Sequence, residues 1–118
     1  MADTLLETDN LNDSAAALAA LLQENNGQDV CLLDLRGISN WTDFFIIATA
    51  TSKTHMDGLE RHVRELCHKK DMDIRGSFRK NSEDEWRLLD LGHVIVHLMT
   101  AAAREFYDLE RLWRQVSS

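Results

Sequence analysis

Two histidines four residues apart, His93 and His97, form a pair whose spacing could hold a metal ion. On a helix, histidines at positions i and i+4 share one face and can bind a single zinc ion. The residues between them include Val94, Ile95 and Val96, which are β-branched and favour a strand. In a strand the two Cα atoms would lie about 13 Å apart, too far for one zinc ion with ligands at about 2 Å. We therefore expect no metal site, one histidine buried or half-buried with its hydrogen bonds satisfied, and the other solvated.

A second candidate centre combines the pair Gly76-Ser77 with Asp90. Nucleotidyltransferases resemble this outline: a Gly-Ser turn precedes two carboxylates that alternate on a strand and hold magnesium. Here Gly92 stands at the alternate position, so the second carboxylate is missing. One carboxylate alone binds magnesium weakly. We expect no catalytic residues, no cofactor and no enzymatic activity. A nucleotide-binding or nucleotidyltransferase-like enzyme that uses the Gly76-Ser77 turn and Asp90 is the alternative function.

The segment WTDFFIIATATS, residues 41–52, could form an anion site. Thr51 or Ser52 would open a helix there, and the free amides of a helix N-terminus bind phosphate. The glycines that let a backbone approach phosphate closely are missing from the segment. Capping of the helix by Thr51 or Ser52 is therefore the preferred interpretation.

Trp86 begins a predicted strand directly after a charged loop. Side chains alternate along a strand, so Trp86, Leu88 and Asp90 share one face, and the residues between them share the other. Exposed aromatic side chains are frequent hot spots of protein interfaces. Trp86 is therefore either a core residue or the anchor for a protein partner.

The composition is typical of one globular domain. The chain has 118 residues, of which 44% are hydrophobic, and no apolar run approaches the roughly 18 residues of a membrane span. The first ten residues contain no base and resemble neither a signal nor a transit peptide. Cys31 and Cys67 are expected to be free thiols, as is usual in a reducing compartment. These features predict a cytoplasmic protein that makes no membrane contact.

Negative charge is concentrated at the N-terminus. Residues 1–35 contain seven acids and no lysine or arginine, which equals the net charge of −7, and the other residues balance at thirteen acids against thirteen bases. Without a strongly basic surface, direct nucleic-acid recognition is not expected. A basic protein partner is compatible with this charge, although charge alone favours a simple effect on solubility.

The elements that would position these residues follow from hydrophobic spacing. Residues 1–10 are expected to form a flexible acidic arm, and Asn12 or Asp13 to cap a helix that stops near Gly27. A second helix opens at Thr51 or Ser52, and its apolar face comprises Met56, Leu59, Val63, Leu66 and Cys67.

Five strands are expected, over residues 30–35, 44–48, 72–78, 86–91 and 93–99. The first two are mostly apolar and should be interior, the third should lie at an edge, and the last two should join tightly around Gly92. A last helix over 101–115 should break near Tyr107–Asp108. The order α-β-β-α-β-β-β-α predicts one α/β domain with a mixed five-stranded sheet, helices packed on it, and a nucleotidyltransferase-like outline without the catalytic carboxylate pair.

Three blocks, TDFFIIATATS, DEWRLLDLGHVIVHLM and REFYDLERLW, together resemble the ribosomal silencing factor family, also called Iojap or RsfS. The resemblance runs from about Leu11 to Trp113 and implies a family domain over residues 11–118. It implies a non-catalytic α/β protein that docks on the fourteenth protein of the large ribosomal subunit, on the face that the small subunit covers. Such a protein would block subunit joining, repress translation and form a homodimer when free.

The resemblance also implies which residues bind the partner. Trp86 matches the family's interface tryptophan, with Leu88 and Asp90 on the same strand, and the other matching positions are Thr42, Asp43, Ser52 and His55. The C-terminal signature is expected to be mainly structural and comprises Tyr107, Asp108, Leu109, Glu110 and Trp113. Two positions depart from the pattern, His93 for a usual acid and Ala50 for a usual glycine. A generic dimerisation module that uses the terminal LERLW helix is a weaker possibility.

Overall fold

A computed structural model of the chain describes residues 2–38, 40, 42–79 and 85–111, and of residues 2–12 it describes only the helical backbone. The elements follow the predicted order: α1 (Ala2–Glu24), β1 (Gln28–Asp34), β2 (Phe44–Thr49), α2 (Lys53–Lys69), β3 (Gly76–Arg79), β4 (Trp86–Asp90), β5 (Val94–Met99) and α3 (Ala101–Tyr107). The predicted α/β class with a five-stranded mixed sheet is confirmed. None of the helices in the described part of the chain is both long and apolar enough to cross a membrane.

The sheet has the strand order β1-β2-β5-β4-β3. β2 and β5 are parallel, and the other neighbouring pairs are antiparallel. The predicted edge position of β3 is confirmed, as is the tight β4–β5 connection around Gly92. The predicted interior position of the first strand is wrong, because among the described strands β1 pairs only with β2 and lies at an edge of the sheet. Its apolar run buries Leu33 on one face, while Leu32 on the other face stays 36% exposed.

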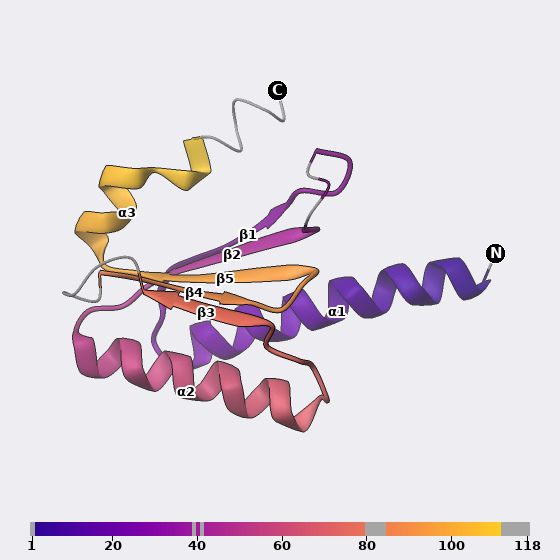
Figure 1. Cartoon of the computed structure of the whole chain (residues 1–118), viewed down its shortest axis with the longest axis horizontal. Helices are drawn as coiled ribbons and strands as arrows, with labels where there is room; N and C mark the ends of the chain where they lie inside the picture. The colour runs from indigo at the N-terminus through magenta and orange to yellow at the C-terminus, as the bar shows by residue number, and fades with distance from the viewer. Residues whose placement is uncertain (1, 39, 41, 80–84, 112–118) are drawn as a thin grey trace.

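The two faces of the sheet are covered differently (Figure 1). α1 and α2 lie along one face and enclose the main core, which includes Leu18, Phe44, Leu59 and Val96. α3 lies on the other face and covers one end of it, over a smaller cluster that includes Ile47 and Met99. One face is thus sealed by two long helices, and the other is covered only in part.

α1 begins earlier than the sequence predicted. It starts at Ala2, so the predicted cap at Asn12 or Asp13 is wrong. Residues 2–12 contain no glycine or proline to interrupt a helix, and this half of α1 projects beyond the sheet (Figure 1). The predicted stop near Gly27 is confirmed: a Cβ atom there would lie 2.7 Å from the Leu22 carbonyl oxygen. The separation of residues 1–10 as a flexible arm stays a prediction.

Arg87 is a buried charge that joins the sheet to α2. Its side chain is 2% exposed, and its guanidinium lies 2.6 Å from the Asp57 carboxylate and 3.2 Å from that of Glu60. Asp57 is half-exposed, and Glu60 also pairs with Arg64 at 2.9 Å. Without Arg87, the Asp57 carboxylate would therefore still be solvated, and the Glu60 carboxylate would still pair with Arg64. The free thiols predicted at Cys31 and Cys67 are also confirmed.

We expect Arg87→Ala to lower the free energy of unfolding by about 1.5 kcal/mol, because the buried aliphatic stem and the ion pairs are lost together. Arg87→Met keeps the apolar volume and removes the charge, and should stay within about 1 kcal/mol of the wild type. Urea unfolding of the three proteins measures both values. A loss in Arg87→Met as large as that in Arg87→Ala would mean that the ion pairs, and not the packing, dominate.

Candidate protein-binding site

The strand β4 presents alternating side chains to the two faces of the sheet. Arg87 and Leu89 are buried on the side of α1 and α2, while Trp86, Leu88 and Asp90 are half-buried on the side of α3. The predicted alternation is therefore confirmed. We call the surface formed by Trp86, Leu88 and Asp90 the β4 face. α3 reaches one end of this face, where Tyr107 packs against Trp86.

Each residue of the β4 face lies beside a residue of the neighbouring strand β5. In the antiparallel register Trp86 lies opposite Met99, Leu88 opposite His97, and Asp90 opposite Ile95. Residues paired in this way project to the same side of the sheet. The three β5 side chains are at most 3% exposed, so they form a buried floor beside the half-buried β4 residues.

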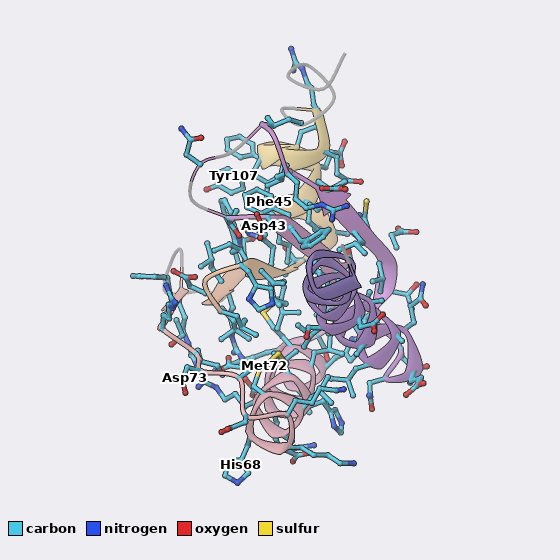
Figure 2. The ribbon with its side chains drawn as sticks, turned by 90° about the vertical axis from the view of Figure 1, so that its right-hand side faces the viewer. Asp43, Phe45, His68, Met72, Asp73 and Tyr107 are labelled. Carbon is cyan, nitrogen blue, oxygen red and sulfur yellow. The ribbon has the colours of Figure 1, made fainter. Side chains whose placement is uncertain are left out.

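The Trp86 indole is held between two partners. Its Nε1–H donates a hydrogen bond of 3.0 Å to Nδ1 of His97. On the α3 side its ring packs against Tyr107, with 4.7 Å between ring centroids. Figure 2 shows Tyr107 beside Phe45 on the side of the sheet that α3 covers. Trp86 is thus part of an aromatic cluster and also reaches the surface.

His97 is buried beneath this cluster. It is 3% exposed, and its ring meets that of Phe45 edge-on at 4.6 Å. Burial lowers the pKa of His97 from 6.5 to about 4, so the ring is neutral at physiological pH. Because an indole N–H can only donate, Nδ1 of His97 accepts and the ring proton sits on Nε2. Within the described residues, that Nε2 has no hydrogen-bond partner.

His93 directly precedes β5 and His97 lies within it, so the pair does not have the helical spacing that one zinc ion would need. β5 begins at Val94, directly after His93, so the strand that the sequence predicted is confirmed. The described residues contain no group of three or more metal-binding side chains. The expectation of a solvated second histidine is wrong: His93 is half-buried, and its Nε2 is enclosed with no hydrogen-bond partner among the residues that the structure describes. Nor is His97 fully satisfied, because only its Nδ1 is bonded.

The pair Gly76-Ser77 does not form the turn required by the alternative function. Both residues belong to β3, and Gly76 lies opposite Asp90 in an antiparallel ladder. The next element described after β3 is the strand β4, so among the described residues no helix N-terminus directs its amides at this pair. The Asp90 carboxylate instead accepts the backbone N–H of Gly92 at 2.8 Å. The described backbone therefore does not favour the alternative function, which would use this pair as a turn.

Gly92 makes the tight β4–β5 connection possible. Its φ of +91° is a conformation that residues with a side chain rarely adopt, and a Cβ there would lie 3.0 Å from the Arg75 guanidinium carbon. We expect Gly92→Ala to lower the free energy of unfolding by about 1 kcal/mol. Gly58→Ala, in the middle of α2 where a Cβ meets nothing within 4 Å, should raise it by about 0.5 kcal/mol. Thermal unfolding of both variants tests the contrast, and a stabilising Gly92→Ala would contradict the account of the turn.

Ser52 and His55, predicted to bind the partner, lie away from the β4 face. Ser52 caps α2 by accepting the backbone N–H of His55 at 3.0 Å, which confirms the preferred interpretation of capping. The His55 ring bridges Asn25, 3.0 Å from its carbonyl oxygen, and the Thr51 backbone N–H at 3.0 Å. These contacts join the end of α1 to the start of α2, on the opposite side of the sheet from Trp86.

Thr42 and Asp43 lie at the other end of the sheet from Trp86. The Asp43 backbone N–H donates to the His93 carbonyl at 3.0 Å, which places Asp43 at the same end as Asp90. Thr42 is 4% exposed. The structure therefore groups Trp86, Leu88 and Asp90, brings Asp43 to the edge of the β4 face, and buries Thr42.

The C-terminal signature holds α3 against the aromatic cluster. The predicted break is confirmed, since α3 ends at Tyr107 and Asp108 adopts a left-handed conformation with φ of +46°. Arg104 lies 2.9 Å from Glu110 and donates to the Thr49 hydroxyl at 3.0 Å. These bonds tie both sides of the break to β2. Trp113 lies outside the described residues.

Sequence reasoning missed two exposed aromatic residues beside the β4 face. Phe78 on β3 is 63% exposed and lies opposite Leu88. Phe106 on α3 is 80% exposed and packs against Tyr107, with 4.9 Å between ring centroids. The β3–β4 register could have indicated Phe78, because it places Phe78 opposite Leu88 and therefore on the same face of the sheet. Exposed aromatics on both sides of Trp86 favour contact with a protein surface.

Comparison with known proteins supplies the family context. The sequence model described as "Ribosomal silencing factor during starvation" matches residues 8–118. The chain is 40% identical to ribosomal silencing factor RsfS of Treponema pallidum over 106 residues, covering 87% of this chain and 92% of that protein. It is 32% identical to "Mitochondrial assembly of ribosomal large subunit protein 1" of Mus musculus, covering 81% of this chain and 43% of that protein. A crystal structure of a Chromobacterium violaceum protein superposes with a TM-score of 0.80 at 30% identity, covering 87% of this chain and 85% of that one.

Proposed function

We propose that this chain, which belongs to the ribosomal silencing factor family, represses translation by docking on the large ribosomal subunit and excluding the small subunit. Family membership associates the chain with translation regulation at the ribosome. Blocking the association of two ribosomal subunits requires no catalysis. A rigid domain bound where the two surfaces would meet is sufficient, and this agrees with a regulatory rather than a catalytic protein.

The observation that carries the proposal is the exposed aromatic surface around the β4 face. Trp86 is a half-buried aromatic residue supported from behind by His97 and from one side by Tyr107. A held aromatic side chain with polar neighbours such as Asp90 fits the usual anatomy of an interface, in which an apolar centre has a polar rim. We assign direct contact to Trp86, Leu88 and Asp90, with Asp43 at the edge.

The remaining predicted site residues support the fold in this proposal. Ser52 caps α2, His55 joins α2 to the end of α1, and the buried Thr42 lies beneath the surface. Variants of these residues would affect binding only through the stability of the domain. In this proposal, some of the residues that match the family pattern contact the partner, and the others stabilise the fold.

The partner we propose is a basic ribosomal protein, the fourteenth of the large subunit, on the face that the small subunit covers. The net charge of −7 suits a basic partner, because complementary charge accelerates association and selects among surfaces. We further propose that the chain is a cytoplasmic homodimer when free, and that it binds without direct nucleic-acid recognition. These points rest on the family resemblance and on the charge.

Co-sedimentation with isolated large ribosomal subunits tests the function. We expect the purified protein to pellet with large subunits and, once bound, to reduce the yield of joined ribosomes when small subunits are added. Adding the protein after joining should have less effect if it acts by occlusion. Failure to bind large subunits at micromolar protein would reject docking, and binding without any loss of joined ribosomes would reject occlusion.

A further inference from the structure

The hydrogen bond between Trp86 and His97 is a direct side-chain contact between the proposed anchor and the buried floor of the sheet. We infer that His97 is a positioning residue that holds the Trp86 indole in the orientation needed for docking. This inference rests on the docking function proposed above. His97 itself lies too deep to touch a partner, since it is 3% exposed.

The acceptor in this bond is held rigidly. His97 lies inside β5, which pairs with β2 on one side and β4 on the other. Its ring is packed edge-on against Phe45, at an interplanar angle of 68°. A buried ring between two strands has little freedom to turn. Nδ1 therefore presents its lone pair at a fixed point, and the indole that donates to it is fixed in turn.

The other contacts of Trp86 are apolar and not directional, with Tyr107 on one flank and the cluster that includes Met99 beneath it. Tyr107 packs against the indole at a tilt of 48°, a contact that permits the indole to slide or rotate in its plane. The directional bond to His97 removes that freedom. An anchor already in its bound orientation loses less conformational entropy on binding, an effect worth about tenfold in affinity for a large side chain.

The chemistry of the His97 side chain favours a role in positioning Trp86 over a role in stabilising the fold. Nε2 has no partner in the described part of the chain, and an unsatisfied buried donor is unfavourable for the folded state. An apolar side chain of similar volume would suit the same surroundings, which include Ile47 and Met99. The imidazole therefore contributes something that the core does not require, and its one bond of 3.0 Å goes to Trp86.

Two substitutions separate the positioning role from a structural one. His97→Leu fills the site with apolar atoms and removes the acceptor. His97→Asn places an amide oxygen close to the position of Nδ1 and keeps an acceptor for the indole, but leaves the site underfilled. We therefore expect the two variants to rank oppositely in stability and in affinity. His97→Leu should be the more stable variant, and His97→Asn should bind large subunits more tightly.

The experiment measures three quantities on each variant: the melting temperature, the affinity for large subunits, and the NMR signal of the Trp86 indole N–H. That signal is identified among the three tryptophans by its loss in Trp86→Phe. We expect His97→Leu to melt within about 5 °C of the wild type, to bind about tenfold more weakly, and to exchange its indole proton faster. We expect His97→Asn to restore both the slow exchange and most of the affinity.

Each result bears on the inference separately from the docking proposal. Wild-type affinity in a folded His97→Leu whose indole exchanges freely would overturn the positioning role and leave docking intact. Weak binding in a folded His97→Asn whose indole stays protected would also overturn it, because His97 would then act by another route. If Trp86→Ala itself binds as tightly as wild type, the anchor assignment fails, and the inference fails with it.

Discussion

Trp86→Ala should weaken binding to the large ribosomal subunit by about 2 kcal/mol or more, which is about thirtyfold in Kd. The indole is the largest side chain of the β4 face, and its position is fixed by His97 and Tyr107. Truncation removes its contact area and leaves the partner surface that it covered without a complement. Because Trp86 is half-buried at the end of β4, the domain should remain folded, although less stable.

The control for this prediction is an apolar residue of comparable exposure on the opposite side of the sheet. Leu32 on β1 is 36% exposed and belongs to the face covered by α1 and α2, since it pairs with Ile46 of the main core. Leu32→Ala should bind large subunits as the wild type does. Sedimentation titrations of the two variants, with circular dichroism to verify folding, give the comparison. Equal affinity of Trp86→Ala and wild type would reject Trp86 as the anchor.

The order of the elements could be predicted because local patterns determined it. The β-branched run around Ile95 distinguished a strand from a metal-binding helix, and Gly92 marked a turn that requires a positive φ of +91°. The alternation along β4 predicted that Trp86, Leu88 and Asp90 share one face. Each of these depends on residues only a few positions apart in the chain.

The rest depended on contacts between distant residues. The apolar run in β1 did not reveal an edge strand, because strand order is set by pairing across the whole sheet. The early start of α1 depended on the continuity of a helix through acidic residues, which reduce helix propensity without breaking it. The partner of Trp86 could be found only once the hairpin register placed His97 beside β4.

The dependence on contacts between distant residues also explains which candidate site residues lie together in the structure and which do not. Trp86, Leu88 and Asp90 came from one strand and remain together. Ser52 and His55 came from a strand-to-helix turn, and sequence alone could not show that this turn lies on the far side of the sheet. Ser52 caps α2, and His55 joins α2 to the end of α1, so in the proposal above these residues support the fold.

The stability of the domain should fall as the pH drops from 7 toward 4, because of His97. Burial lowers the pKa of His97 from 6.5 to about 4. Between these two values the unfolded chain binds a proton at this residue and the folded chain does not, so the free energy of unfolding decreases as the pH falls. The full difference corresponds to about 3 kcal/mol, of which about 2 kcal/mol should be lost by pH 5.

His97→Leu isolates this contribution, because every other titrating group is unchanged. Urea unfolding at pH 7.5 and pH 5, at one protein concentration, should show a loss in wild type that exceeds the loss in His97→Leu by about 2 kcal/mol. Equal pH dependence of the two proteins would mean that His97 is not buried as a neutral ring. Protonation at Nδ1 also removes the acceptor for the Trp86 indole, but in the folded chain this occurs only as the pH approaches the His97 pKa of about 4. In folded wild type, protection of the indole proton should therefore persist at pH 5, where the stability has already fallen, and should decline only near pH 4.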